Sequence, residues 1–399
     1  MAGRRFFAML LAFAALWLTE EATMSVSAQS AVPTEKVRVG AERTEQYLPL
    51  LRGRRVAVLA NHTAVVRDEH LVDMLVREGV NLVGIVSPEH GFRGTADAGE
   101  KVASGVDERT GVPIWSLYSS KGRHLTAEQT AAFDVMVVDM QDVGLRFYTY
   151  YITMLDVVAD CAAAGREVII LDRPNPNGMY TDGPTLDLRY KSGVGALPIP
   201  VVHGLTMGEI AMMAIGEGWS PKCNVKVIPC AGYTHSTRYT LPIAPSPNLR
   251  TQHAIYLYPS TCLFEGTVCS LGRGTEHPFE CYGHPAMRGG TFTFTPRSMA
   301  GAKRPPLMDT LCRGVDLRSV ADEEIIAGGF NLEYIIDAYR RTGLSAEQFF
   351  TPFFEKLVGV AYVREMIVAG CTADEIRARW QPSLDEYRTT RRKYLLYEE

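Results

Sequence analysis

At 399 residues the chain is long enough for two domains with a sizeable core, and its 22% charged and 46% hydrophobic residues are typical of a soluble globular protein. The formal net charge of -4 argues against a nucleic-acid-binding protein, which usually presents a basic face. The eight cysteines include no C-x-x-C pair and predict no zinc finger. Their even number permits disulfides in an exported protein, but the sequence does not define the connectivity.

The first residues have the pattern of a secretory signal peptide. Arg4 and Arg5 precede an apolar stretch at 6–18 that is too short to span a bilayer comfortably, and small residues at 26–28 offer a cleavage site. We therefore expect residues 1–28 to be removed and the mature chain to be periplasmic or secreted. An uncleaved membrane anchor is the alternative. A lipid anchor is not expected, because no cysteine lies near the cleavage site.

Strand and helix patterns alternate through the first part of the mature chain. A lead-in and a first helix occupy 29–53, and apolar runs then alternate with helical spacing. This alternation is typical of βαβ units, so we expect an α/β domain with a mainly parallel sheet over 29–255. The expected strands are 55–60, 81–86, 113–118, 134–139, 167–172, 199–203 and 224–229, and the expected helices are 68–78, a short helix from 126, 149–164 and a helix from 206.

The pattern changes near residue 255. Residues 243–290 are rich in proline, glycine, cysteine and aromatic side chains and show little periodicity. Short strand and helix signals follow, as in a smaller α+β domain packed against the first. We expect this domain over 256–399, with elements at 291–295, 332–341, 346–354 and 373–380.

Polar side chains gather directly after the expected strands. The stretch Ser-Pro-Glu-His-Gly-Phe-Arg-Gly at 87–94 follows one strand and carries Glu89, His90 and Arg93 just after a break at Pro88. The carboxyl ends of parallel strands meet at one edge of a sheet, where ligands bind, so we expect these side chains to lie near a substrate. The other residues in such positions are Asn61, His62, Asp139, Gln141, Asp142, Arg146, Asp172, Arg173, Asn175 and His203.

Carboxylates together with aromatic and amide side chains suit a sugar. Hydrolysis of a glycoside needs an acid with a raised pKa to protonate the leaving oxygen, and usually a second group that assists attack at the anomeric carbon. Arginines would suit an anionic group on the substrate. Structural roles are the alternatives: Asp139 would only orient Arg146, Asp172 and Arg173 would form an ion pair at a strand exit, and His203 would be a turn histidine.

A second group of polar residues follows. Ser246 and Asn248 stand in a rigid Pro-Ser-Pro-Asn turn, and Glu265 and Arg273 flank a glycine-rich loop of the kind that lets backbone approach a ligand. The loop matches neither glycine pattern of nucleotide-binding sites and does not indicate a phosphate site. No metal-ligand spacing is matched by the nearby His277, Glu280 and His284. The sequence therefore predicts neither a metal nor a cofactor.

In this order the motifs resemble those of the NamZ-type exo-β-N-acetylmuramidases, glycoside hydrolases of bacterial peptidoglycan turnover. The resemblance covers nearly the whole mature chain. Its pieces are Ser-Pro-Glu-His-Gly-Phe-Arg-Gly at 87–94, Asp-Met-Gln-Asp-Val-Gly-Leu-Arg-Phe-Tyr-Thr-Tyr at 139–150, Leu-Asp-Arg-Pro-Asn-Pro-Asn-Gly at 171–178, His-Gly-Leu-Thr-Met-Gly-Glu-Ile-Ala at 203–211, Pro-Ser-Pro-Asn at 245–248, Phe-Glu-Gly-Thr at 264–267, Gly-Arg-Gly-Thr at 272–275, Pro-Phe-Glu at 278–280 and Arg-Lys-Tyr-Leu-Leu-Tyr at 392–397.

The resemblance implies a Rossmann-like catalytic domain, a smaller C-terminal auxiliary domain and an active site in the cleft between them. It also implies a glycosidase that releases terminal, non-reducing β-linked N-acetylmuramic acid from MurNAc-GlcNAc fragments of peptidoglycan, with Glu89 as the catalytic residue. Our hypothesis is that Glu89 acts as general acid, assisted by His90.

Several roles stay open in this hypothesis. The group that assists water or stabilises the oxocarbenium-like state would be Asp139, Asp142 or Asp172, or the substrate's own acetamido group would be the nucleophile. The lactyl carboxylate of muramic acid would be held by one of the arginines Arg146, Arg173 and Arg273. Further substrate contacts are expected from Asn61, Arg93, Gln141, Tyr148, Asn175, His203, Ser246, Asn248 and Glu265.

The chain departs from the family pattern in two places. Many relatives have a glutamate where this chain has Leu271, so an acidic contact that bears on subsite preference is absent, and many have a glycine where Met179 stands in a loop. The alternative function is a periplasmic muropeptide- or sugar-binding protein without catalysis, which would retain its ligand after Glu89→Gln. An esterase or amidase is disfavoured, because the chain has no G-x-S-x-G nucleophile elbow.

Overall fold

The computed structural model describes residues 36–88, 92–93, 105–117 and 123–399. The expected signal peptide at 1–28 and the two residues Glu89 and His90 lie outside this part of the chain. Residues 36–399 form one compact unit. All eight cysteines carry free thiols. In the described part of the chain, no helix combines the length and apolarity that a membrane span requires.

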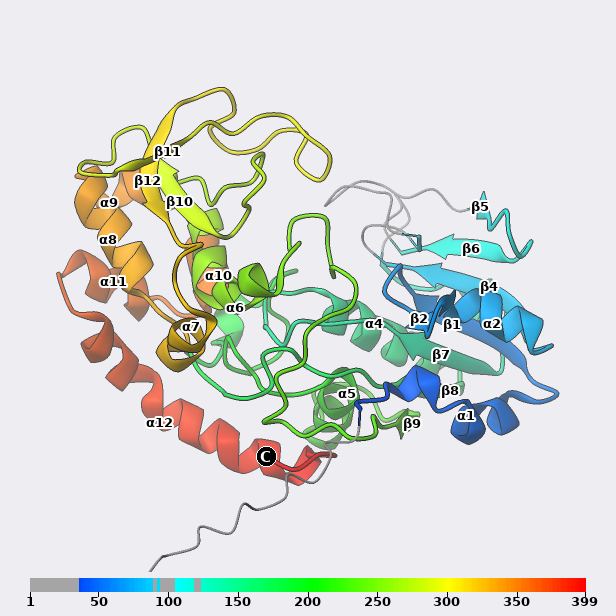
Figure 1. Cartoon of the computed structure of the whole chain (residues 1–399). Helices are drawn as coiled ribbons and strands as arrows, with labels where there is room; N and C mark the ends of the chain where they lie inside the picture. Colours follow the sequence, from blue (N-terminus) through cyan, green and yellow to red (C-terminus); the bar gives the residue numbers. More distant parts are fainter. Residues whose placement is uncertain (1–35, 89–91, 94–104, 118–122) are drawn as a thin grey trace, which may run out of the picture. The chain divides into compact units, whose positions relative to one another are not determined.

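A seven-stranded sheet organises the first half of the chain (Figure 1). Its order is β5-β6-β4-β1-β7-β8-β9, and every neighbouring pair is parallel except β5 with β6. The chain runs outward from β1 and then resumes at β7 on the other side of β1, which is the order reversal that creates a ligand crevice in such sheets. The strands are β1 (Arg55–Ala60), β4 (Asn81–Ser87), β5 (Gly105–Val106), β6 (Pro113–Ser116), β7 (Val135–Asp139), β8 (Glu167–Leu171) and β9 (Asn224–Ile228).

Helices cover both faces of this sheet, because successive side chains of a strand point to opposite faces. Ala57 and Leu59 of β1 pack in the apolar cluster that contains α4 and α5, whereas Val56 and Val58 pack in the cluster that contains α1 and α2. This arrangement confirms the expected Rossmann-like α/β fold. The helices of this half are η1 (Gly40–Glu42), α1 (Thr44–Leu51), α2 (Leu71–Arg77), α3 (Ala127–Ala132), α4 (Tyr150–Ala163), η2 (Leu188–Tyr190) and α5 (Met207–Gly216).

The second half is a smaller α+β arrangement, as expected. A three-stranded antiparallel sheet of order β10-β12-β11 packs with helices. Its strands are β10 (Cys281–His284), β11 (Phe292–Phe294) and β12 (Cys312–Asp316). Its helices are α6 (Gln252–Thr261), η3 (Cys262–Gly266), α7 (Asp322–Gly328), α8 (Glu333–Thr342), α9 (Ala346–Phe349), α10 (Phe353–Val358), α11 (Tyr362–Val368), α12 (Ala373–Arg391) and η4 (Arg392–Tyr394).

Helix α12 carries the end of the chain back to the first half (Figure 1). Tyr387 donates a hydrogen bond to the His203 carbonyl at 2.6 Å, and Arg391 donates to the Gly204 carbonyl at 2.7 Å. Beyond the helix, the Tyr397 hydroxyl donates to Asp172 at 2.6 Å. The last residues therefore belong to the packing around the large sheet.

The structure differs from the expected elements in three places. Residues 68–70 lie in a short hairpin of β2 (Val65–Val66) and β3 (Glu69–His70), and the His70 side chain caps α2, so that the helix begins later than expected. Residues 199–203 form no strand, because Pro200 cannot donate to a ladder and Val202 makes only isolated bridges. Helix α6 occupies the stretch that showed little periodicity, since residues 254–261 are buried all round the helix.

Candidate functional site

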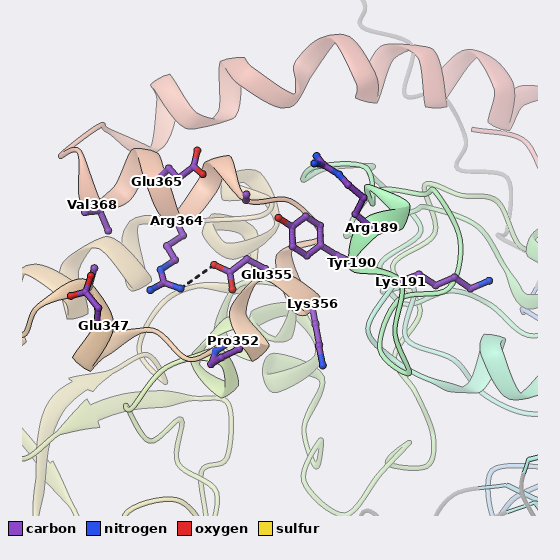
Figure 2. A pocket seen from close by; sticks show the side chains of 12 residues that line it. Arg189, Tyr190, Lys191, Glu347, Pro352, Glu355, Lys356, Arg364, Glu365 and Val368 are labelled. Carbon is purple, nitrogen blue, oxygen red and sulfur yellow. Dashed lines mark hydrogen bonds and ion pairs between the residues drawn. The ribbon is translucent and has the colours of Figure 1, made fainter.

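A cleft of about 670 Å³ lies between η2 and helices α9 to α11 (Figure 2). Its lining carries both signs of charge, and two of its members, Arg364 and Glu355, form an ion pair at 3.3 Å. None of the site residues expected from the sequence lines it. The lining residues are Arg189, Tyr190, Lys191, Ala346, Glu347, Pro352, Glu355, Lys356, Ala361, Arg364, Glu365 and Val368.

A smaller cleft of about 190 Å³ brings together five of the expected substrate-binding residues, Tyr148, Ser246, Asn248, Glu265 and Arg273. Its lining comes from residues 147–150, which lead into α4, and from the 246–249 turn, together with residues of α6, η3 and the following loop. The cleft therefore lies where the two halves of the chain meet. Its other lining residues are Phe147, Thr149, Tyr150, Leu249, Tyr258 and Phe279.

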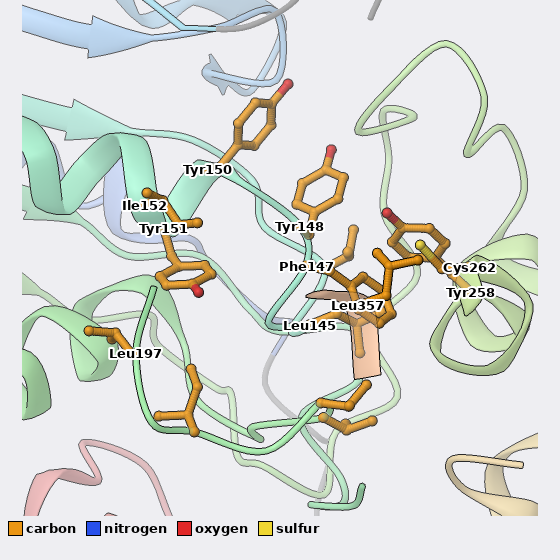
Figure 3. Packing of buried hydrophobic residues seen from close by; sticks show 14 of the residues in the cluster. Leu145, Phe147, Tyr148, Tyr150, Tyr151, Ile152, Leu197, Tyr258, Cys262 and Leu357 are labelled. Carbon is orange, nitrogen blue, oxygen red and sulfur yellow. The ribbon is translucent and has the colours of Figure 1, made fainter. Parts of the chain in front are cut away.

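Five of the residues that line this cleft are aromatic, namely Phe147, Tyr148, Tyr150, Tyr258 and Phe279. Figure 3 shows the first four of them. Tyr258 packs edge-on against Phe147 at 5.3 Å and against Phe279 at 4.8 Å between ring centres. Figure 3 shows Tyr148 and Tyr150 pointing the same way, and the Tyr148 hydroxyl donates to the Pro245 carbonyl at 2.9 Å. Apolar faces with hydroxyl groups at their tips are suited to the mixed surface of a sugar ring.

The backbone presents Arg273 between two glycines that no other residue could replace without strain. Gly272 has φ +85° and Gly274 has φ +80°, a region that side chains with a Cβ rarely adopt. A Cβ on Gly272 would lie 2.5 Å from the His277 carbonyl oxygen, and one on Gly274 would lie 2.6 Å from that of Arg297. The Gly-Arg-Gly sequence thus fixes the loop that carries the arginine.

Arg273 is paired with Glu265 and stacked on a ring. Its Nε and Nη2 donate to Glu265 Oε1 at 3.0 and 2.7 Å, and its guanidinium lies 5.0 Å from the centre of the Phe279 ring. Burial opposes the charge of Arg273, but the ion pair outweighs burial and raises its pKa. Phe279 has φ 68°, a conformation that costs on the order of 1–3 kcal/mol and is found at functional sites. Leu271 is buried in the apolar core, not in the cleft wall.

Asp142 does not line this cleft, but it is a buried carboxyl group with a pKa close to neutral. Its Oδ1 accepts from the Gly144 amide at 2.7 Å, and its buried Oδ2 has no hydrogen bond of normal geometry among the described residues. Burial raises the pKa of Asp142 to about 7, although the amides of Gly144, Val143 and Tyr151 oppose this shift. The charge of Asp142 also contributes to raising the pKa of Tyr148, which lines the cleft.

Asp139 and Arg173 form a buried ion pair with each other. Arg173 Nε and Nη2 donate to the two Asp139 oxygens at 2.5 and 2.9 Å, and Nη2 also donates to the Val65 carbonyl at 3.1 Å. This differs from the expected alternatives, in which Asp139 would orient Arg146 and Asp172 would pair with Arg173. The two exit loops after β7 and β8 are joined in this way, and both charges are used within the protein.

Asp172 holds the start of α5 and the end of the chain. Its oxygens accept from the Thr206 hydroxyl at 2.7 Å, the Tyr397 hydroxyl at 2.6 Å and the Gly208 amide at 2.9 Å. Burial raises the pKa of Asp172 to about 6, against the effect of these donors. With a fully buried side chain and three donors, Asp172 has a structural position in this fold.

Two arginines that we expected to bind substrate also make their contacts within the protein. Arg146 is fully buried and donates to the carbonyls of Pro184, Ile199 and Leu357 at 2.7, 2.8 and 2.9 Å, and burial lowers its pKa to about 10. It therefore bonds the two halves of the chain to each other. Arg93 forms ion pairs with Asp107 and Asp73, whose carboxylates are largely buried.

The amides at the sheet edge brace the exit loops. Asn61 accepts from the Thr63 hydroxyl at 2.6 Å, Gln141 donates to the Pro174 carbonyl at 2.7 Å, and Asn175 donates to the Leu205 carbonyl at 2.9 Å. His203 is fully buried, and burial lowers its pKa to about 3, so the ring is neutral. The sequence places these groups at one edge, but their contacts are with neighbouring loops.

The sequence did not identify Tyr258 and Phe279 as site residues. Tyr258 lies on a helix without apolar periodicity, and the special feature of Phe279 is a backbone angle that residue type does not reveal. In the sequence, the Pro-Phe-Glu motif at 278–280 was the feature that could have identified Phe279 as a site residue. Within the described residues, no group of three His, Cys, Asp or Glu side chains is arranged to hold a metal ion.

Comparison with known proteins gives consistent matches over both halves. Residues 56–253 match the family model "Exo-beta-N-acetylmuramidase NamZ, N-terminal", and residues 256–397 match the corresponding C-terminal model. The chain is 34% identical over 381 residues to the peptidoglycan beta-N-acetylmuramidase NamZ of Bacillus subtilis, which covers 91% of this chain and 92% of that protein.

Two crystal structures of DUF1343 family proteins from Bacteroides fragilis have the same fold. One is 53% identical with a TM-score of 0.86, and the other is 28% identical with a TM-score of 0.74. Each comparison covers 91% of this chain and 99% of the crystallised chain.

Proposed function

Because the chain belongs to the exo-β-N-acetylmuramidase NamZ family, it is a glycosidase of cell-wall turnover, and we propose that it releases terminal, non-reducing β-linked N-acetylmuramic acid from MurNAc-GlcNAc fragments of peptidoglycan. The observation that carries this proposal is the cleft itself. It joins aromatic walls suited to a sugar with an arginine suited to an anionic substituent. The signal-peptide pattern at 1–28 supports action in the periplasm or outside the cell.

We assign the general acid to Glu89, assisted by His90. Both residues directly follow β4, which neighbours β1 and thus ends beside the reversal of strand order where ligands bind. Among the three candidate aspartates, we assign the assisting role to Asp142. Asp139 and Asp172 use both oxygens on buried partners, whereas Asp142 has one oxygen without a hydrogen bond of normal geometry in the described part of the chain and a pKa of about 7.

The test is hydrolysis of para-nitrophenyl β-N-acetylmuramide by the purified mature chain, beside the matching glucosaminide and the Glu89→Gln variant. We expect release from the muramide by the wild type, and a loss of about 10²- to 10⁴-fold in Glu89→Gln, the usual contribution of a general acid. Equal release by the variant would remove Glu89 from the chemistry. Tight muropeptide binding without release by the wild type would instead identify a binding protein.

A further inference from the structure

A carboxylate distinguishes N-acetylmuramic acid, the sugar that the proposed reaction releases, from N-acetylglucosamine. N-acetylmuramic acid is N-acetylglucosamine with a lactyl ether, so a site that selects the first must recognise an anion at that position. Three arginines were candidates for this contact. The structure places Arg173 in a buried pair with Asp139 and places Arg146 on three backbone carbonyls, so neither guanidinium faces a ligand site.

Arg273 differs from Arg173 and Arg146 because one edge of its guanidinium is still available to a ligand. Glu265 engages the side edge, formed by Nε and Nη2, and does so through a single oxygen. The end edge, formed by Nη1 and Nη2, has no hydrogen-bond partner that we find within the described residues. A planar guanidinium carries five N–H donors, and two parallel donors on one edge match the two oxygens of a carboxylate.

The open edge is held in place before any ligand arrives. The side chain is 23% exposed and borders the cleft, so it combines access with a fixed position. Gly272 and Gly274 adopt backbone angles that shape the loop on both sides of it, and Phe279 supports the guanidinium from a backbone conformation of positive φ. Little side-chain freedom is then left to lose on binding, which favours affinity.

We infer that the Arg273 end edge binds the lactyl carboxylate of the substrate and is the feature that selects N-acetylmuramic acid over N-acetylglucosamine. This inference rests on the proposed function and names the specificity determinant of the same cleft. Glu265 is a positioning residue in this scheme. It holds the side edge of Arg273 and directs the end edge toward the bound sugar.

The test removes the guanidinium charge from the protein and the carboxylate charge from the substrate, one at a time. The wild type, Arg273→Gln and the control Arg250→Gln are compared on para-nitrophenyl β-N-acetylmuramide and on its lactyl methyl ester. Arg250 is a suitable control because it is a neighbouring arginine paired with Glu276 at 3.1 Å and does not line the cleft.

We expect the wild type to prefer the acid over the ester by about 10- to 100-fold in kcat/KM, the range of charge-assisted hydrogen bonds, mainly through KM. Arg273→Gln should hydrolyse both substrates at the rate at which the wild type hydrolyses the ester, and Arg250→Gln should keep the full preference. Glu265→Gln should lose part of the preference through KM. An acid preference that survives Arg273→Gln, or no preference in the wild type, would overturn the inference.

A binding measurement separates this inference from the proposed function. Calorimetric titration with free N-acetylmuramic acid and with its methyl ester needs no hydrolysis. Preference for the acid that depends on Arg273, without turnover of either chromogenic sugar, would retain the inference and refute the proposed function. Equal affinity for acid and ester in the wild type would overturn the inference whatever the activity. If Arg273→Gln does not fold, Arg273→Lys keeps the charge, loses the paired donors and should lose most of the preference.

Discussion

The carboxyl group of Asp142 predicts a specific pH dependence of stability. The perturbation is Asp142→Asn, which keeps an oxygen acceptor for the Gly144 amide and removes the titration. In the folded chain burial raises the pKa of Asp142 from the ordinary 3.8 to about 7. The folded state therefore binds this proton more tightly than the unfolded state does, and the stability that the group contributes is present below pH 3.8 and is lost as pH rises through 7.

The magnitude follows from the size of the shift. One pKa unit corresponds to about 1.4 kcal/mol, so a shift of about three units changes the free energy of unfolding by ~4 kcal/mol over the whole range. Between about pH 5 and about pH 8 the change from Asp142 alone is ~2.5 kcal/mol. Asp172, whose pKa burial raises to about 6, acts in the same direction. His203 acts in the opposite direction, because burial lowers its pKa to about 3 and its contribution is lost as pH falls from 6.5.

Urea unfolding of the wild type and Asp142→Asn at both pH values isolates the one group, since Asp172 and His203 are present in both proteins. The stability difference between the two proteins should move by ~2.5 kcal/mol in favour of the variant on going from about pH 5 to about pH 8. The slope of unfolding with urea should be the same for both. A stability difference that does not change with pH would refute the reasoning, because Asp142 would then be ionised over the whole range.

Three further substitutions test the packing around the site. Tyr397→Phe removes the hydroxyl that donates to Asp172 and accepts from the Cys230 amide, and it should destabilise the fold by about 1–3 kcal/mol in denaturant unfolding, the usual cost of a buried group left unsatisfied. Arg173→Met should cost about 3–5 kcal/mol, because it leaves Asp139 charged, buried and alone, and adding Asp139→Leu should recover much of that loss. Gly274→Ala should cost at least about 1–2 kcal/mol from its positive φ alone, and a calorimetric titration should show weaker binding of N-acetylmuramic acid.

Much of the fold could be predicted because parallel strands that are buried on both faces can be recognised in a sequence by their apolar residues. β1, β7 and β8 are near-continuous apolar runs, and the structure has them where the pattern indicated. The helix α5 was equally clear, since Thr206 and Glu209 form the capping box that begins it. Helix α6 was not predictable by this method, because a helix buried all round has no polar face.

The site was predictable in part, for a physical reason. The sequence identifies which polar residues follow strands, but not whether a given oxygen or nitrogen finds a partner inside the protein. Asp139, Asp142 and Asp172 all lie at or just beyond the ends of β7 and β8, yet both oxygens of Asp139 and of Asp172 accept hydrogen bonds, whereas one oxygen of Asp142 finds no donor of normal geometry among the described residues. Arg146 and Arg273 are likewise indistinguishable by type, and only the folded chain separates the buried one from the one in the cleft.

The return of α12 to the large sheet has a consequence for how the protein is made and how it can be recombined. Asp172 leaves the ribosome long before Tyr397 does, so one of its hydrogen bonds forms only when synthesis is almost finished. A fragment that stops near residue 255 would leave the surroundings of β8 without the contacts from Tyr387, Arg391 and Tyr397. If the second half were exchanged between relatives, the residues of the first half that contact it would have to match. We therefore expect the two halves to evolve together.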